Sequence, residues 1–269
     1  MAQSVNNSIP FPPLEMRKLV GPTELAEFDN PSGNFVFNEF LIPEEAYRSV
    51  FDFGCGCGRN ARKLMQQKIK PQKYVGIDLH KGMSNWCQNN LATRDRGFSF
   101  YHYDVYNIGF NPDSQQNFAK FPVGDDEFSL VVAISVFTHI VEELVVEFLK
   151  ECSRIMTPDG YFLASWFLFN KDYFPMMQEF QNSLYINLID PTNAVIYDYH
   201  WLFKICQEVG LTPVKIFPPV VKGFQWYIIL RSAELGLPAD ELPEDSADFG
   251  IIRASADIEN PQQIGLSPS

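Results

Sequence analysis

Residues 50–58 read Val50-Phe51-Asp52-Phe53-Gly54-Cys55-Gly56-Cys57-Gly58. An apolar strand pattern leads into three glycines at alternate positions, and a helical pattern follows over residues 59–67. Glycine permits a tight turn and removes side chains from places where a ligand must touch the backbone. Because the first backbone N–H groups of a helix have no partner within the helix, this turn indicates a site for a nucleotide-like cofactor.

The spacing of the glycines distinguishes two classes of cofactor. The dinucleotide fingerprint G-x-G-x-x-G has its third glycine at the sixth position, where this chain has Arg59. Asp78 ends a second apolar run, 74–78, and lies 20 residues after Gly58. A carboxylate there can accept hydrogen bonds from both ribose hydroxyls of NAD or of S-adenosylmethionine, or it can cap a helix. The early third glycine argues against NAD.

Further motifs follow in order, and together they carry a family resemblance. They are Asp52-x-Gly54-x-Gly56-x-Gly58, Gly76-Ile77-Asp78, Asp104 after a third strand, Asp126-x-Phe128-x-Leu130-Val131 leading to Ser135-Val136-Phe137-Thr138-His139, and Arg154-Ile155-Met156-x-Pro158-x-Gly160. Over roughly residues 48–230 this series resembles the class I S-adenosylmethionine-dependent methyltransferases. The resemblance implies S-adenosylmethionine as cofactor and S-adenosylhomocysteine as product.

The alternation of short apolar runs with helical periods predicts a parallel α/β sheet. Strands are expected near 49–53, 73–78, 98–103, 128–134, 161–167, 213–217 and 224–230, with helices over 14–20 and 141–156, the latter stopped by Pro158 and Gly160, and a helix from Asp198 to Gly210. The resemblance implies a Rossmann-like, seven-stranded, mostly parallel sheet with helices on both faces and an antiparallel last strand. We expect an N-terminal cap segment over 1–47, the methyltransferase domain over 48–231 with a substrate-side insertion at 168–198, and an acidic tail or linker over 232–269.

Candidate cofactor-binding residues follow from the resemblance. Asp78 would accept the ribose hydroxyls, and Asp52 would lie near the amino-acid end of the cofactor or satisfy only loop N–H groups. Asp104 would bond the adenine amino group and Val105 would offer a backbone N–H, while Met83 would cover the adenine face or belong to the core. The remaining expected contacts come from Gly54, Cys55, Gly56, Gly58, Leu79 and Ser135.

Candidate catalytic and substrate residues lie after the fourth strand and in the insertion. An imidazole can remove a proton from a hydroxyl near neutral pH, so His139 is the candidate general base; its alternative roles are to cap the next helix or to contact the cofactor. The candidate substrate residues are Arg17, Trp166, Tyr197, His200 and Trp201. The aromatic residues between Trp166 and Trp201 could instead form a local core.

The absence of certain motifs narrows the range of possible methyltransferase reactions. No D/N/S-P-P-Y/F/W sequence, the motif of amide and adenine N-methyltransferases, follows the fourth strand. That strand ends in Ile134 rather than a carboxylate, which differs from the Mg²⁺-dependent catechol-type enzymes, so we expect a metal-independent enzyme with no metal site. The five cysteines form no C-x-x-C pair, which favours free thiols in a reducing, cytoplasmic setting.

Charge bears on the partners. The chain has a net charge of −12, of which residues 232–269 carry −7, from eight acidic residues and one arginine. Such a balance disfavours a nucleic-acid partner. No apolar run approaches the roughly 20 residues that span a bilayer, and no signal peptide is evident, so no membrane partner is expected. The acidic tail could lead to a further domain or partner.

The expected activity is therefore methyl transfer from S-adenosylmethionine to a small-molecule, sugar or peptide-derived acceptor, most readily at oxygen, as in natural-product or sugar modification. A hydroxyl acceptor needs a base such as His139, whereas a carboxylate acceptor needs none and would give Arg17 a larger role. Three alternatives stay open at this point: an NAD-dependent oxidoreductase, an RNA or protein methyltransferase, and a non-catalytic cofactor-binding subunit.

Overall fold

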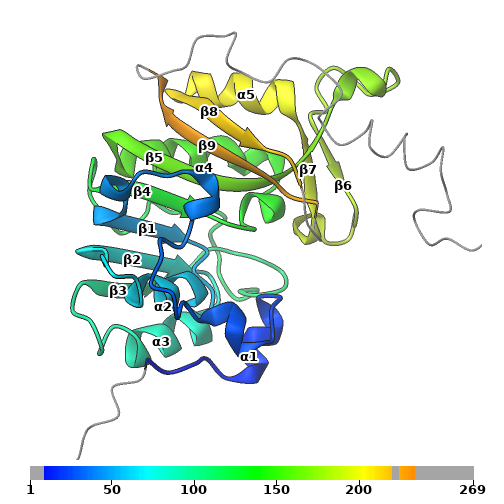
Figure 1. The fold of residues 1–269 in the computed structure, drawn as a ribbon. Helices are drawn as coiled ribbons and strands as arrows, with labels where there is room; N and C mark the ends of the chain where they lie inside the picture. Colours follow the sequence, from blue (N-terminus) through cyan, green and yellow to red (C-terminus); the bar gives the residue numbers. More distant parts are fainter. Residues whose placement is uncertain (1–8, 220–223, 234–269) are drawn as a thin grey trace, which may run out of the picture. The chain divides into compact units, whose positions relative to one another are not determined.

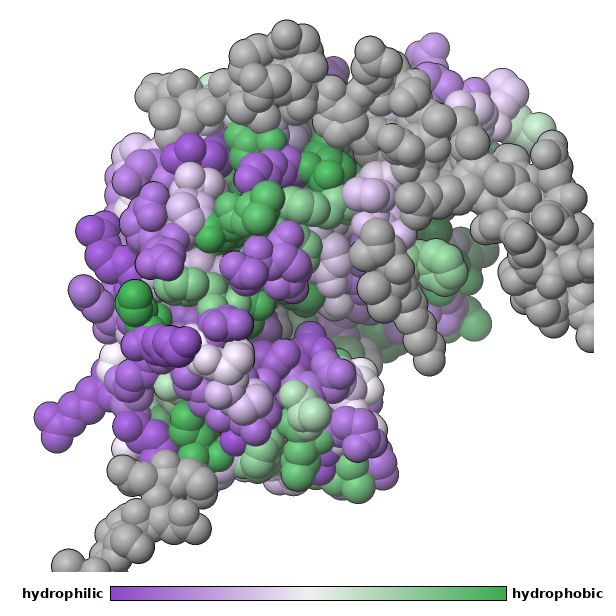
Figure 2. All heavy atoms as spheres, viewed as in Figure 1, coloured by the Kyte–Doolittle hydropathy of each residue, from purple (hydrophilic) through white to green (hydrophobic). Residues whose placement is uncertain are grey.

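The computed structural model describes residues 9–219 and 224–233. The chain divides into two compact units, each considered by itself. The first contains the chain up to Val132 together with Ile155–Gly160, and the second contains Ala133–Arg154 and the chain from Tyr161 onward. The acidic tail lies almost entirely outside the described residues. Hydrophilic and hydrophobic side chains are interspersed on the face seen in Figure 2.

The first unit is built on four parallel strands (Figure 1). β1 (Ser49–Phe53) pairs with β2 (Lys73–Asp78) on one side and with β4 (Phe128–Ala133) on the other, and β2 also pairs with β3 (Phe98–His102). Consecutive parallel strands need crossover connections, and these carry α2 (Arg59–Met65) and α3 (Lys81–Asn90). The strand order β3-β2-β1-β4 brings the carboxyl ends of β1 and β2 together at one edge.

An N-terminal segment precedes this sheet. It contains α1 (Leu14–Leu19) and three 3₁₀ helices, η1 (Leu25–Phe28), η2 (Asn38–Phe40) and η3 (Glu44–Arg48). The η3 helix leads directly into β1, and its buried Tyr47 contacts the rings of Phe35 and Phe37. The segment over residues 9–48 is therefore packed on the first unit rather than extended from it.

The second unit is organised around β5 (Met156–Phe169), whose later part pairs antiparallel with β9 (Trp226–Ser232) and parallel with β7 (Val195–Asp198). β8 (Leu211–Phe217) pairs antiparallel with β9, and β6 (Ser183–Tyr185) pairs antiparallel with β7. The described part of this unit also contains helices α4 (Glu142–Ile155) and α5 (Tyr199–Glu208) and the 3₁₀ helices η4 (Phe137–His139), η5 (Lys171–Tyr173) and η6 (Pro191–Asn193). The antiparallel last strand is confirmed.

The expectation of seven strands is wrong, because the described residues form nine. The two extra strands, β6 and β7, fall within the 168–198 insertion, where scattered aromatic residues give no clear alternation. A second correction concerns Pro158 and Gly160. The helix before them ends at Ile155, and both residues lie in β5 rather than in a turn that stops the helix.

Buried apolar side chains form the core of each unit. In the first unit, the centroid of the Phe121 ring lies 5.0 Å from the centroid of the Phe51 ring and 5.0 Å from that of the Phe53 ring. All five cysteines are free, as expected, and all five are buried. Among the described residues, no helix combines the length and the apolar character needed to cross a membrane.

Candidate cofactor and active site

The turn after β1 needs glycine at each of its three glycine positions. Gly54, Gly56 and Gly58 have φ angles of +76°, +54° and +79°, the left-handed region that side chains disfavour. Gly58 is also the residue that caps the N-terminus of α2. The alternate spacing of glycine in the sequence therefore reflects three backbone positions with left-handed geometry.

The backbone N–H groups of this turn hold it against β2. Those of Gly54 and Cys55 both donate to the carbonyl oxygen of Ile77, at 2.8 and 3.0 Å, and that of Gly56 donates to Oδ2 of Asp78 at 2.7 Å. The N–H groups of these three turn residues are therefore all used in hydrogen bonds within the protein. The turn fixes the position of the Asp78 carboxylate.

Asp78 is placed to accept further hydrogen bonds. Its Oδ1 accepts the backbone N–H of His80 at 2.8 Å and its Oδ2 accepts that of Gly56, which leaves each carboxylate oxygen with a further lone pair. Burial raises the pKa of Asp78, and these two hydrogen bonds oppose that rise. The cap of α3 is His80, whose Nδ1 accepts from the N–H of Met83 at 3.3 Å, so Asp78 is not the cap.

Asp52 is a buried carboxylate that is only half satisfied. It lies opposite Gly76 in the β1–β2 register and is 1% exposed. Its Oδ2 accepts the hydroxyl of Tyr74 at 2.8 Å, and its Oδ1 has no hydrogen-bond partner among the described residues. Burial raises the pKa of Asp52 to about 6, against the opposing effects of Tyr74 and Asn60. Such an oxygen can accept from a cationic or water donor.

The loop after β3 carries the two candidate adenine contacts. Asp104 is exposed, and the amide of Asn111 donates to its Oδ1 at 3.0 Å; this hydrogen bond is the first cause of its lowered pKa. Val105 is buried, and its backbone N–H donates to the carbonyl of Tyr103 at 2.9 Å. A ligand at Val105 would therefore share or replace a hydrogen bond that is already made.

Two further candidates lie after β2. Leu79 accepts a hydrogen bond from Nε2 of His102 at 3.1 Å through its carbonyl, which ties the loop after β2 to the end of β3. Met83 is 2% exposed and packs in a cluster with Phe28 and Cys57. Its core role is therefore visible in the structure, and its contact with an adenine stays a prediction.

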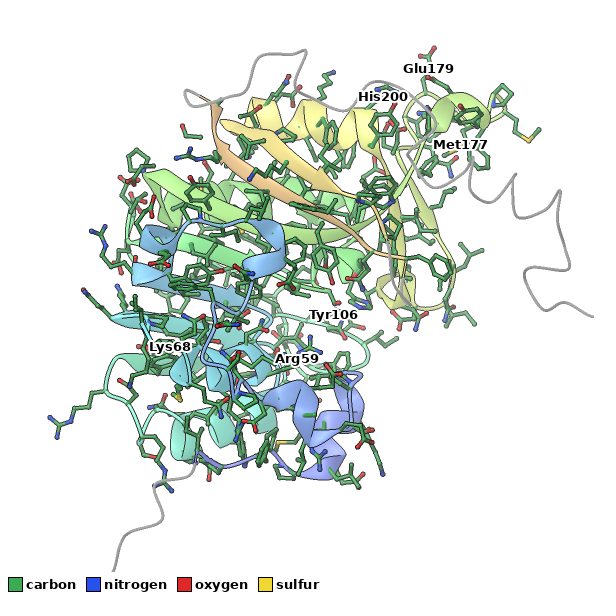
Figure 3. The ribbon with its side chains drawn as sticks, viewed as in Figure 1. Arg59, Lys68, Tyr106, Met177, Glu179 and His200 are labelled. Atoms are coloured by element: carbon green, nitrogen blue, oxygen red, sulfur yellow. The ribbon has the colours of Figure 1, made fainter. Side chains whose placement is uncertain are left out.

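The candidate residues thus fall into two groups. The candidates in the first unit are Arg17, Asp52, Gly54, Cys55, Gly56, Gly58, Asp78, Leu79, Met83, Asp104 and Val105. The candidates in the second unit are Ser135, His139, Trp166, Tyr197, His200 and Trp201. The first group surrounds the glycine turn and the ends of β2 and β3. Figure 3 labels two neighbours of this group, Arg59 at the start of α2 and Tyr106 in the loop after β3.

His139 is exposed and is oriented by a single backbone carbonyl. Its Nδ1 lies 2.8 Å from the carbonyl oxygen of Thr192. A carbonyl can only accept, so Nδ1 carries the proton and Nε2 of the neutral ring keeps its lone pair. This tautomer is the one that a general base requires.

Ser135 stands in a strained conformation near the end of β4. Its φ of +56° is unusual for a residue other than glycine. Its backbone N–H donates to Oγ of Ser165 at 2.7 Å and its hydroxyl donates to Oε1 of Gln225 at 3.0 Å. These hydrogen bonds hold the strained turn that leads to His139.

The aromatic candidates of the second unit form a contiguous cluster of ring contacts. The Trp166 ring lies 4.3 Å from that of Phe137 and 5.7 Å from that of Tyr197, and Tyr197 stacks on Trp201 at 5.9 Å. Trp166 and Tyr197 are completely buried, which supports the alternative of a local core for these two, whereas Trp201 is half-buried. His200 is at the start of α5, and its Nε2 lies 3.8 Å from Oδ2 of Asp172. Figure 3 labels His200 together with Met177 and Glu179, which come from the insertion.

Two residues at the site were not found from the sequence. Tyr74 supplies the hydroxyl on Asp52, and no spacing rule predicts a hydrogen bond from one strand to the next. Arg62 is 4% exposed on the buried face of α2, beside Ala61 and Leu64. An arginine among the apolar positions of an amphipathic helix is a signal that could have identified it.

In the described part of the chain, no group of three or more histidine, cysteine or acidic side chains could hold a metal ion. Arg17, the candidate cation for an acidic acceptor, is half-buried on α1, where its Nε donates to the carbonyl of Pro12 at 3.2 Å.

Comparison with known proteins connects this site to a family. Residues 51–164 match the family described as "Methyltransferase domain". Two curated relatives are an uncharacterized methyltransferase of Emericella nidulans, 25% identical over 132 residues, and a fatty-acid O-methyltransferase of Mycolicibacterium smegmatis, 29% identical over 118 residues. These matches cover 46% and 43% of this chain, and only 43% and 36% of the relatives, so the chain matches less than half of their length.

A solved structure shares the fold. The S-adenosylmethionine-dependent methyltransferase from Aquifex aeolicus aligns over 82% of this chain and 98% of its own, with a TM-score of 0.51 and 18% identity. Together, the family match over 51–164 and the glycine turn identify this part of the chain as a methyltransferase domain of the class I S-adenosylmethionine-dependent kind, with S-adenosylmethionine as its cofactor.

Proposed function

We propose that this chain transfers the methyl group of S-adenosylmethionine to an oxygen atom of a small-molecule, sugar or peptide-derived acceptor. The observation that carries the oxygen assignment is the hydrogen bond from Nδ1 of His139 to the Thr192 carbonyl. It leaves Nε2 able to take the proton that a hydroxyl loses when it is methylated. The fatty-acid O-methyltransferase among the relatives is consistent with an oxygen acceptor.

The first unit offers a fitting set of groups for the cofactor. We assign the ribose hydroxyls to Asp78, whose two oxygens retain lone pairs, and the amino group to the unpartnered Oδ1 of Asp52. The glycine turn removes the side chains that would crowd the ligand. When bound, the cofactor supplies an activated methyl group on sulfur, and the sulfur takes the electron pair of the broken C–S bond.

The remaining chemistry belongs to the chain. It must hold the acceptor oxygen in line with the methyl carbon and the sulfur, and orientation of this kind supplies up to about 7–11 kcal/mol in favourable cases. With a hydroxyl acceptor, the oxygen forms the new C–O bond while its proton moves to Nε2 of His139. Positioning of the base within hydrogen-bond reach is then the second requirement.

A carboxylate acceptor is the second candidate function, and the name of the fatty-acid O-methyltransferase favours it. A carboxylate is already deprotonated, so His139 would not be needed. A cation that binds the acceptor would matter more, and Arg17 is our candidate. Replacing His139 therefore separates the two acceptor classes.

The test is turnover with methyl-labelled S-adenosylmethionine against matched panels of hydroxyl, carboxyl and amine compounds. We expect labelled product and S-adenosylhomocysteine from the hydroxyl panel, or from the carboxyl panel if the second candidate is correct. Transfer to amines alone would contradict the oxygen assignment. Cofactor binding with no transfer to any panel would favour a non-catalytic binding subunit.

A further inference from the structure

Residues 9–30, which we call the N-terminal strap, precede the part of the chain that matches the family. That match begins at residue 51. The strap contains α1 and η1, yet the helices themselves bury little: α1 has no buried residue and η1 has only Phe28. Burial of apolar helix faces is therefore only a small part of what holds this segment in place.

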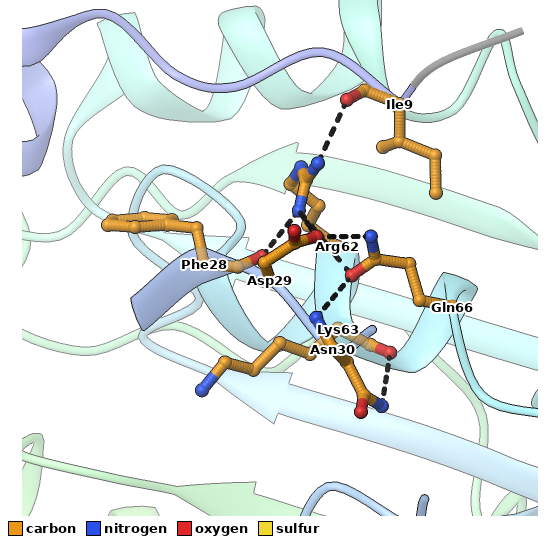
Figure 4. A network of polar contacts seen from close by, with 7 residues as sticks. All are labelled: Ile9, Phe28, Asp29, Asn30, Arg62, Lys63 and Gln66. Atoms are coloured by element: carbon orange, nitrogen blue, oxygen red, sulfur yellow. Dashed lines mark hydrogen bonds and ion pairs between the residues drawn. The ribbon is translucent and has the colours of Figure 1, made fainter. Parts of the chain in front are cut away.

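Arg62 provides the attachment (Figure 4). Its side chain is 5% exposed, and its Nη1 donates to the carbonyl of Phe28 and to Oδ1 of Asp29, both at 2.7 Å. Its Nη2 donates to the carbonyl of Ile9 at 3.2 Å, and the guanidinium lies 3.5 Å from the centroid of the Phe11 ring. One side chain from α2 thus binds both ends of the strap.

The neighbouring turn of α2 reinforces this attachment. The amide of Gln66 donates to Oδ1 of Asp29 at 2.5 Å, and its Oε1 accepts the backbone N–H of Asn30 at 2.8 Å. The amide of Asn30 donates to the carbonyl of Lys63 at 3.3 Å. The hydrogen bond from Arg62 is the first cause of the lowered pKa of Asp29, which shows that the carboxylate is stabilised in its charged form.

Between its two attached ends, the strap lies on the glycine turn. A Cβ atom added to Gly56 would stand 2.8 Å from Cγ1 of Val20. Val20 and Met16 also pack against the cluster of Phe28, Cys57 and Met83. The strap therefore covers both the residue that donates to Asp78 and the methionine at the start of α3.

We propose that the N-terminal strap is part of the cofactor site, and that Arg62 is a positioning residue that keeps the strap closed over the glycine turn. This inference rests on the proposed placement of the cofactor at Asp52 and Asp78. Arg62 itself touches no reacting atom. A site that must be covered to bind its ligand loses affinity in proportion to the fraction of time it is open.

The first experiment measures the affinity and dissociation rate of S-adenosylhomocysteine for Arg62→Met. We expect the dissociation constant to rise about tenfold, as it would if the strap were closed a tenth of the time, and most of that change to appear as faster dissociation. Asp29→Ala, which removes the partner on the strap, should shift both quantities in the same direction. Arg62→Lys should recover part of the affinity because it keeps the charge.

The control is Lys73→Met. Lys73 forms an ion pair with Glu127 and lies 4.7 Å from the Phe128 ring centroid, so it combines the same two kinds of contact in the same unit. Its removal should leave the affinity unchanged. Folded Arg62→Met and Asp29→Ala proteins that bind like the wild type would overturn the inference, as would an equal loss in Lys73→Met.

The second experiment detects closure directly, and its first comparison uses only the wild type. Trypsin can cleave after Arg17 and Lys18 on α1, and the side chain of Lys18 is 54% exposed. We expect S-adenosylhomocysteine to slow this cleavage in the wild type and to protect less in Arg62→Met. A rate of cleavage that saturating S-adenosylhomocysteine does not change would overturn the inference. If the ligand binds and Asp78→Ala weakens it, such a result leaves the proposed cofactor placement intact.

Discussion

Asp52 and Asp78 are both buried carboxylates, but their neighbours satisfy them to different degrees. Asp78 accepts a backbone N–H on each oxygen, whereas Asp52 has only the hydroxyl of Tyr74 and one oxygen without a partner among the described residues. Burial raises the pKa of both groups, and that of Asp52 reaches about 6. Asp52 therefore lowers the stability of the empty protein near neutral pH.

We predict that Asp52→Asn stabilises the empty protein, and that the gain grows with pH. The unfolded carboxyl group titrates near 3.8 and the folded one near 6, so between these values the folded state holds the extra proton and wild-type stability falls as pH rises. At about 1.4 kcal/mol per pKa unit, the full effect by pH 7 is roughly 3 kcal/mol. Urea denaturation at pH 5, 6, 7 and 8 measures it.

Asp104→Asn is the matched control, because Asp104 is exposed and its pKa is lowered rather than raised. A lowered pKa contributes stability above the unfolded value, so this variant should show no gain that grows between pH 5 and 8. The account of Asp52 fails if the difference between Asp52→Asn and the wild type is the same at every pH.

His139 provides the second prediction at the scale of single residues. If it is the base, His139→Gln should lower kcat by roughly 10²–10⁴-fold with a hydroxyl acceptor, while cofactor affinity stays within a few-fold. The wild-type rate should rise with pH, and the variant should lose that dependence. Measurement of kcat against pH for both proteins tests this.

Near-normal kcat in His139→Gln, with the same dependence on pH as in the wild type, would remove His139 from the mechanism. It would leave a carboxylate acceptor as the better explanation. A loss that appears in cofactor affinity or melting temperature instead would support a capping or cofactor-contact role.

At this scale, the sequence identified residue types better than their partners. Asp52 and Asp78 were found because a carboxylate is unusual inside an apolar strand, as at Asp52, or at the end of one, as at Asp78. The partner of Asp52 and the attachment through Arg62 depend on which strand or segment packs alongside, and a single sequence does not contain that information. The roles of Trp166 and Tyr197 were left open for the same reason, since burial is what distinguishes a core residue from one that lines a substrate pocket.

Among the structural elements, the turn between β1 and α2 is the most constrained by its glycines. We predict that Gly58→Ala is more destabilising than Gly210→Ala, although both glycines have a φ of +79°. A Cβ at Gly58 would lie 2.5 Å from Cδ1 of Leu91 and 3.0 Å from Sγ of Cys87, whereas one at Gly210 would meet nothing within 4 Å.

The conformational penalty is common to both variants and costs about 1–2 kcal/mol. Overpacking at Gly58 adds roughly 1–3 kcal/mol. Urea denaturation of the two variants compares the free energies of unfolding. Equal losses of unfolding free energy in the two variants would show that the residues around Gly58 move to accommodate the added methyl group without cost.

The sequence predicted elements well where periodicity was strong. β1, β2 and the helix from Asp198 were found because apolar runs and a capping aspartate mark them, and Asp198 does accept the N–H of Trp201 at 3.0 Å. β6 and β7 were missed because three- and four-residue strands are too short for a period to show. Pro158 lies near the beginning of β5, where a strand tolerates proline better than in its middle.

For the whole molecule, the resemblance to a family and the order of the elements were predictable because five motifs follow one another along the chain in the order typical of that family. The division into two compact units was not, since it cuts through β5 rather than a linker. The expected acidic tail over 232–269 lies outside the described residues from residue 234 onward.

We predict that deletion of residues 238–269 leaves the melting temperature and cofactor affinity unchanged. The segment is acidic, contains four prolines and lacks the periodicity of a core element. Thermal unfolding and calorimetry of the truncated and full chains test this. A fall of more than a few degrees would favour docking of Phe249-Gly250-Ile251-Ile252 on the rest of the protein.

The central claim is that the glycine turn and Asp78 hold the cofactor, and calorimetry with S-adenosylhomocysteine tests it most directly. We expect micromolar binding to the wild type and none of NAD. Asp78→Ala should lose about 1–3 kcal/mol of binding free energy, through the loss of two charge-assisted hydrogen bonds. A folded Asp78→Ala protein that binds S-adenosylhomocysteine as tightly as the wild type would contradict the claim.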